Sequence, residues 1–129
     1  LVGSIVALAD KFDLITGLFS IDQKPTGSKD PFALRRAVLG IIRIIIEYKL
    51  DLSLDNILSF ALSSYNLEKK AATIEEIKIF LIERLKNLLK EENIEHNYID
   101  AVLKAQDNIN IFQIVQKIYS LKNFLSTSE

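Results

Sequence analysis

The chain has 129 residues, of which 49% are hydrophobic and 26% charged, and its formal net charge is −1. This size fits one domain or two small subdomains, and the composition is typical of a soluble protein. Cysteine is absent, which excludes disulfides and thiolate metal sites, and no apolar run approaches the roughly 20 residues of a membrane span.

The spacing of apolar residues predicts helices throughout the chain, with no alternating pattern of the kind that indicates strands. The predicted fold class is therefore all-α, with about six helices. A polar, lysine-bearing stretch at 65–72 indicates a boundary, so we expect two parts, 1–66 and 67–129. In chain order, the helices are expected at about 1–19, 30–48, 53–64, 73–92, 98–105 and 111–125.

Capping signals mark three of the helix starts. Asp30, followed by a proline, opens the second helix, and Thr73 with Glu76 forms a capping box at the fourth. Asn110 caps the last helix. The second helix is apolar on most sides and is expected to be central and buried. The phenylalanines at apolar positions are expected in the core rather than as platforms for stacked bases: Phe12, Phe19, Phe32, Phe60, Phe80 and Phe112.

The loop before the second helix, and one face of that helix, are candidates for binding an anion. Lys24 and Lys29 flank a glycine in the loop, and a helix start offers backbone N–H groups and a positive dipole end to a phosphate. Arg36 and Arg43 share one face of the helix, and Gly40 between them allows another backbone to approach. Ordinary surface charge or internal salt bridges would also explain this spacing, so both interpretations stay open.

Arg35 is expected to form a structural salt bridge. It points toward the apolar side of the second helix, where a guanidinium needs a carboxylate partner. Asp10 and Asp13 on the first helix are the candidates. Such a pair would hold the first two helices together.

Two sequence runs are long and unusual in composition. They are LADKFD at residues 8–13 and PTGSKDPFALRRA at residues 25–37, with weaker likeness continuing through Ile44 and Glu47. Together they resemble the β subunit of bacterial-type glycyl-tRNA synthetases. After residue 66 the resemblance rests on the helical pattern.

The resemblance implies an internal piece of that subunit, spanning the end of an HD-like helical region and a small helical bundle that leads toward the anticodon-binding domain. The absence of an initial methionine agrees with a fragment. In that family a cytoplasmic α2β2 enzyme joins glycine to tRNA(Gly). Its α subunit forms glycyl-adenylate with Mg-ATP, and its β subunit supplies tRNA recognition. The piece itself is expected to hold no catalytic residue, cofactor or metal.

The leading hypothesis is that the first half presents a basic face to tRNA. Lys24, Lys29, Arg36 and Arg43 would contact phosphates, which position RNA without reading its bases. The alternative is an interface with the α subunit or another β module that RNA never touches. A third interpretation, a helical adaptor unrelated to synthetases, requires the resemblance to be accidental.

An enzymatic alternative comes from the HD resemblance. Asp10 resembles the last metal-binding aspartate of HD phosphohydrolases, but the histidines of that family precede it. Here the only histidine, His96, comes long after Asp10. One carboxylate is too few ligands for a divalent metal. His96 is expected instead to help cap the helix that follows it or to face solvent.

Overall fold

The computed structural model describes residues 2–21, 25–27, 29–30, 32–63, 70–105 and 109–127, the side chains of the last two excepted. Within these residues the fold is all-α, as predicted, and none of the helices is long and apolar enough to cross a membrane. The helices are α1 (Val2–Ser20), α2 (Leu34–Glu47), α3 (Leu54–Ala61), α4 (Lys70–Glu91), α5 (His96–Lys104) and α6 (Ile111–Thr127).

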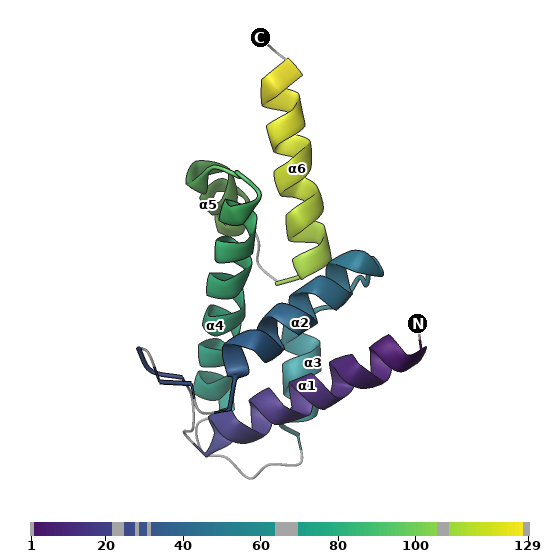
Figure 1. The fold of residues 1–129 in the computed structure, drawn as a ribbon, viewed down its shortest axis with the longest axis vertical. Coiled ribbons are helices and arrows are strands. Elements are labelled where there is room, and N and C mark those ends of the chain that lie inside the picture. The colour runs from purple at the N-terminus through teal and green to yellow at the C-terminus, as the bar shows by residue number, and fades with distance from the viewer. Residues whose placement is uncertain are drawn as a thin grey trace.

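Helix α2 occupies the centre of the molecule, as its apolar sequence predicts. It packs against α1 on one side and against α4 and α6 on the other (Figure 1). Helices α4 and α6 extend in one direction from α2, and α5 packs on α6. The residues of α2 that are buried repeat every three or four positions, as one face of a helix requires: Leu34, Val38, Ile41, Ile42 and Ile45.

One buried hydrophobic cluster runs through the described residues. It joins side chains of α1, α2 and α3 to side chains of α4, α5 and α6. Helices α3 and α4 are also linked by an ion pair, in which Lys78 Nζ lies 2.7 Å from Asp55 Oδ1. The division into 1–66 and 67–129 stays a prediction, although both parts contribute to this cluster.

The start of α6 is fastened to the loop that precedes α3. Asn110 and Gln113 both donate side-chain hydrogen bonds to the carboxylate of Asp51, and the backbone N–H of Leu54 donates to the carbonyl of Ile109 at 2.9 Å. Asn110 also accepts a hydrogen bond from the backbone N–H of Gln113 at 3.2 Å, which confirms the predicted cap. This end of α6 is therefore held by several independent contacts.

The other end of α6 extends past the body of the molecule (Figure 1). Phe124 and Leu125 are exposed there. Between the two ends, Tyr119 donates a hydrogen bond to the carboxylate of Glu92. This hydrogen bond, together with burial, raises the pKa of Tyr119 to about 12, so the phenol keeps its proton at physiological pH.

Helix α4 begins earlier than predicted, at Lys70 rather than Thr73. Ala71 and Ala72 have high helix propensity and extend the helix by one turn. Thr73 and Glu76 therefore lie inside α4, and the capping box predicted for its start was wrong.

Two of the phenylalanines that were expected in the core are exposed. Phe12 and Phe19 are buried as predicted, but Phe32 and Phe60 have 46% and 82% of their surface exposed. Helix α3 has only eight residues and buries the face that carries Leu58. Since two residues correspond to about 200° of helical rotation, Phe60 lies on the opposite face.

Candidate nucleic-acid interface

The start of α2 differs from the prediction in a way that bears on anion binding. The helix begins at Leu34, because Ala33 adopts a left-handed conformation (φ 52°) that interrupts the helical path. The carboxylate of Asp30 accepts hydrogen bonds from the backbone N–H groups of Leu34 (2.8 Å) and Arg35 (3.0 Å). The capping role of Asp30 is thus confirmed. However, N–H groups that were expected to suit a phosphate already bind a carboxylate, whose charge repels one.

The loop before α2 contains a tight turn. Thr26 and Lys29 exchange two backbone hydrogen bonds of 3.0 and 2.8 Å, and Gly27 has a positive φ of 55°, which favours glycine. Arg35 Nη2 donates a hydrogen bond to the carbonyl oxygen of Gly27 at 2.6 Å and so ties the turn to α2. Lys29 is exposed on this turn, while Lys24 lies outside the described residues.

The contact that Arg35 makes is not the predicted one. Asp10 and Asp13 are both exposed on α1, and among the described residues neither forms an ion pair with Arg35. The physical reason is that the guanidinium reaches back along its own chain to the turn carbonyl. Arg35 therefore organises the loop rather than joining α1 to α2.

Replacing Asp30 with alanine is expected to lower the free energy of unfolding by about 1 kcal/mol, because two first-turn N–H groups lose their acceptor. Asparagine keeps an acceptor oxygen and should retain much of the effect. Urea denaturation followed by circular dichroism measures both. Asp10→Ala is the matched control, expected within about 0.5 kcal/mol of the parent. Equal stability of the Asp30→Ala and Asp10→Ala variants would contradict a capping role.

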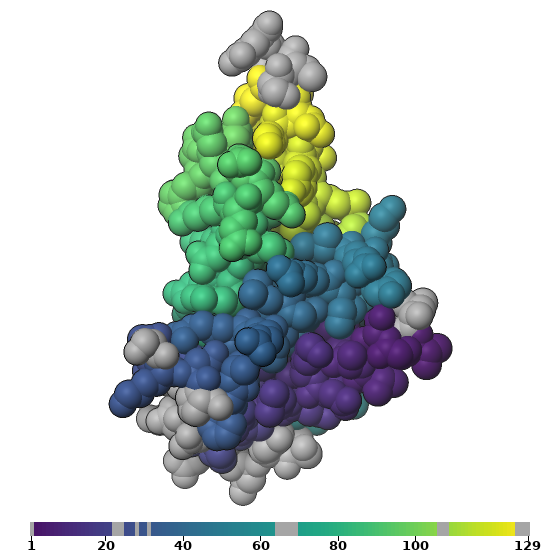
Figure 2. Space-filling view, viewed as in Figure 1, coloured from purple at the N-terminus to yellow at the C-terminus, as the bar shows by residue number. Residues whose placement is uncertain are grey.

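The outer face of α2 carries the arginines singled out in the sequence. Arg36 and Arg43 are exposed and seven residues apart, which places them two turns from each other, roughly 10 Å along the helix axis. Gly40 lies between them on the same face. Figure 2 shows the surface of α2 uncovered between α1 and α4 in this view.

Gly40 leaves room for a side chain of α1 on the surface of α2. A Cβ atom at this position would lie 2.7 Å from Cε and 3.9 Å from Nζ of Lys11, so the lysine side chain crosses α2 over the glycine. The close approach expected at Gly40 is therefore made by a side chain of the same protein. Because Gly40 lies between Arg36 and Arg43, the Lys11 ammonium adds a cation to that face. We call Lys11, Arg36 and Arg43 the cationic face.

The charges of the cationic face are not neutralised by carboxylates within the described residues. The ion pairs found there involve other side chains, and Glu47, one turn after Arg43, forms none with it. Cations without carboxylate partners keep their attraction for an external anion, and Arg36 and Arg43 are exposed to one. Lys29 belongs to the turn before α2, which Arg35 ties to the helix, and so it does not share the helical face that carries Arg36 and Arg43.

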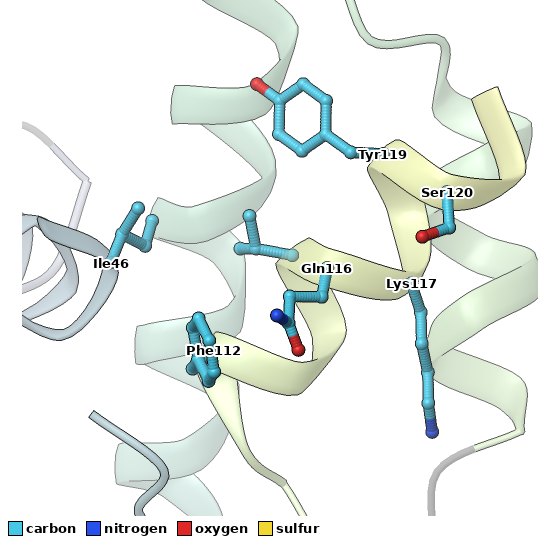
Figure 3. Close-up of a pocket in the computed structure, with 7 residues that line it drawn as sticks. Ile46, Phe112, Gln116, Lys117, Tyr119 and Ser120 are labelled. Atoms are coloured by element: carbon cyan, nitrogen blue, oxygen red, sulfur yellow. The ribbon is translucent and has the colours of Figure 1, made fainter. Parts of the chain in front are cut away.

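A hollow of about 640 Å³ lies between the end of α2 and α6, and it has fewer charged groups that could bind a ligand than the cationic face has. In Figure 3, Ile46 of α2 lies opposite Phe112 of α6, and Lys117 is the one charged side chain that lines it. The hydroxyl of Tyr119 is already bound to Glu92. The cationic face is therefore the stronger candidate for a site.

The two residues considered for metal binding, His96 and Asp10, lie on different helices. His96 is the first residue of α5, and its Nε2 lies 2.7 Å from Asp100 Oδ2, one turn further along the same helix. Asp10 lies on α1. Within the described residues, no three His, Cys, Asp or Glu side chains are close enough together to hold a metal ion.

Comparison with known proteins defines first a class and then a family. The family model that matches residues 1–104 describes the glycyl-tRNA synthetase β subunit, which places the chain among aminoacyl-tRNA synthetase subunits. The match covers most of the chain. The chain therefore belongs to the glycyl-tRNA synthetase β-subunit family, as its sequence resemblance predicts.

Curated relatives agree with this assignment. The glycine–tRNA ligase β subunit of Janthinobacterium sp. (strain Marseille) is 40% identical over 131 residues, which cover 99% of this chain and 18% of that protein. The corresponding protein of Azotobacter vinelandii is 47% identical over 107 residues, covering 82% of this chain and 16% of the relative. The chain thus spans less than a fifth of the length of these relatives.

Proposed function

We propose that the chain is a non-catalytic helical segment of a glycyl-tRNA synthetase β subunit that contributes to tRNA binding and subunit architecture. The parent enzyme would be a cytoplasmic α2β2 assembly that attaches glycine to tRNA(Gly), with Mg-ATP bound by its α subunit. Family membership supports this setting. The segment would take part in holding the nucleic acid while the chemistry occurs elsewhere.

The observation that carries the proposal is the cationic face. Arg36 and Arg43 are exposed on one side of α2, and Lys11 is brought between them by the contact over Gly40. Their separation along the helix, roughly 10 Å, allows them to contact different phosphates of one RNA backbone. Guanidinium groups are well suited to phosphates, because their planar donors match the phosphate oxygens.

Contacts of this kind attract RNA without reading its sequence. Each phosphate neutralised by a cation releases condensed counterions, so the logarithm of the affinity falls linearly with the logarithm of salt concentration. The slope depends on the number of phosphates contacted. Salt dependence is therefore a direct measure of whether the cationic face touches RNA.

Replacing Arg36 and Arg43 with alanine in the complete α–β enzyme is expected to weaken tRNA(Gly) binding and to flatten its salt dependence. The loss of two phosphate contacts should reduce the magnitude of the log–log slope by roughly 1.4 to 1.8. Filter binding or fluorescence anisotropy over a range of salt concentrations measures the slope. The rate of glycyl-adenylate formation should stay unchanged, because that step would belong to the α subunit.

A matched control separates a local effect from a change in total charge. The double variant Lys104→Ala with Lys117→Ala removes the same charge from exposed positions on α5 and α6. Its slope should stay close to that of the parent enzyme. If both double variants give the parental slope, the cationic face does not contact RNA.

A second candidate function is an interface element that RNA does not touch. The exposed apolar side chains of Phe60 on α3 and Phe124 on α6 favour a packing role for other parts of the segment's surface. Photochemical crosslinking of bound tRNA discriminates between the two functions. Crosslinks to peptides containing residues 24–43 support RNA binding, whereas crosslinks from those peptides to the α subunit or to another part of the β subunit support the interface.

A further inference from the structure

An apolar groove runs between α1 and α3, on surfaces that the cationic face does not use. It encloses about 680 Å³. Among the described residues that line it, Asp13 is the only charged one. Its lining residues are Ile5, Leu8, Ala9, Phe12, Asp13, Leu52, Asn56, Ile57, Phe60, Ala61 and Ser63.

The groove is bordered by large apolar side chains that remain in contact with solvent. Phe60 has 82% of its surface exposed and Ile5 has 48%. Val2 and Val6, near the same end of α1, are 77% and 55% exposed. An apolar groove bordered by exposed Phe60 and Ile5, with further exposed apolar side chains on α1, indicates a docking surface.

We propose that this groove binds an apolar helix from another part of the same β-subunit polypeptide. The residues that match this chain make up only 18% of the Janthinobacterium relative, so most of such a polypeptide lies outside the segment described. A segment joined to the same chain reaches the groove at a high effective concentration, and therefore needs no strong affinity of its own.

The chemistry of the groove defines what fits it. Its walls offer methyl groups and aromatic rings, with polar groups from Asn56, Ser63 and Asp13, so the occupant presents an apolar face with few charges. A polyanion such as RNA finds no cationic partner among the described residues of the groove, because none of those that line it is a lysine or an arginine. Different residues of α1 therefore face α2 and the groove. Lys11 lies over Gly40 of α2, whereas Phe12 and Asp13 line the groove.

The test uses the complete β subunit. A photo-crosslinking amino acid, benzoylphenylalanine, replaces Phe60, which is exposed and tolerates a larger aromatic group. Irradiation is expected to give an internal crosslink within one β polypeptide, seen as a monomer-sized product whose digestion yields a peptide from outside residues 1–129. The same amino acid at Asn87, on the exposed face of α4 away from the groove, is the matched control and should not give that peptide.

A second measurement does not depend on the crosslinking chemistry. Because residues 1–129 contain no cysteine, a cysteine placed at Phe60 is identified by mass spectrometry of its own peptide. In the complete subunit its alkylation should be at least about tenfold slower than that of Asn87→Cys, because the occupied groove excludes the reagent. A Phe60→Cys variant that reacts as fast as the control overturns the proposal.

Crosslinks to a molecule other than the same β polypeptide also test the proposal. Crosslinks that join two β subunits, or that join β to the α subunit or to tRNA, would show a different occupant and overturn the proposal. The cationic face plays no part in this experiment. Failure of the RNA-binding test and failure of this test are therefore distinguishable.

Discussion

Replacing Ile42 with alanine is expected to lower the free energy of unfolding by roughly 2 to 5 kcal/mol. Ile42 has no exposed surface and lies on α2, the helix that packs against α1, α4 and α6. Removing its side-chain atoms forfeits their transfer free energy and leaves a cavity among several helices at once. Such a cavity cannot collapse through the movement of one neighbour alone, so the upper part of this range is expected.

Urea denaturation of the chain, followed by circular dichroism, measures this loss. Ile79→Ala is the matched control, because the same atoms are removed from a side chain that is 52% exposed on α4. Its effect should stay below about 1 kcal/mol, since partial exposure reduces the area returned to water. Comparable losses for the two variants would contradict the central position of α2.

The second large effect is expected at the link between α3 and α4. Replacing Asp55 with alanine should lower the free energy of unfolding by about 1 to 2 kcal/mol. Lys78 has only 16% of its side chain exposed, and it loses the carboxylate that lies 2.7 Å from its Nζ. Glu75 remains, but at 3.7 Å it is a weaker partner.

The dependence of this link on pH follows from the pKa of Lys78. The hydrogen bond that Lys78 donates to Asp55 raises that pKa above its usual 10.5, although burial acts in the opposite direction. Because the folded pKa is above the unfolded one, the stabilisation is complete below 10.5 and is lost as the pH rises through the folded pKa.

A double-mutant cycle measures the coupling between the two side chains. It compares Asp55→Ala, Lys78→Ala and the double variant, both well below pH 10.5 and well above it. The coupling energy should be present at the lower pH and should shrink at the higher one. A coupling energy that does not change with pH would show that the contact is not an interaction between charges.

The helices were predictable because their apolar residues repeat with the helical period. The spacing places Val38, Ile41, Ile42 and Ile45 on one face of α2, and all four are buried. The start of α2 was not predictable. It depends on the left-handed conformation of Ala33, a residue type with no preference for that region.

The cationic face was predictable in part. The interval between Arg36 and Arg43 fixes them on one side of a helix whichever neighbours it has. Lys11 could not be found in this way, because its position depends on how α1 packs against α2. The one available signal was Gly40, a glycine in the middle of a helix, which indicates a close contact without naming the partner.

The positions at which α6 is fastened have a mechanical consequence. Hydrogen bonds to Asp51 fix its first turn and the hydrogen bond from Tyr119 to Glu92 holds its middle, whereas Phe124 and Leu125 lie exposed at the distant end. The residues after Tyr119 extend the helix by roughly 12 Å, so a bend of about 10° near Tyr119 displaces its last turn by roughly 2 Å. A small movement of the turn that carries Glu92 would thus shift whatever attaches to the end of α6.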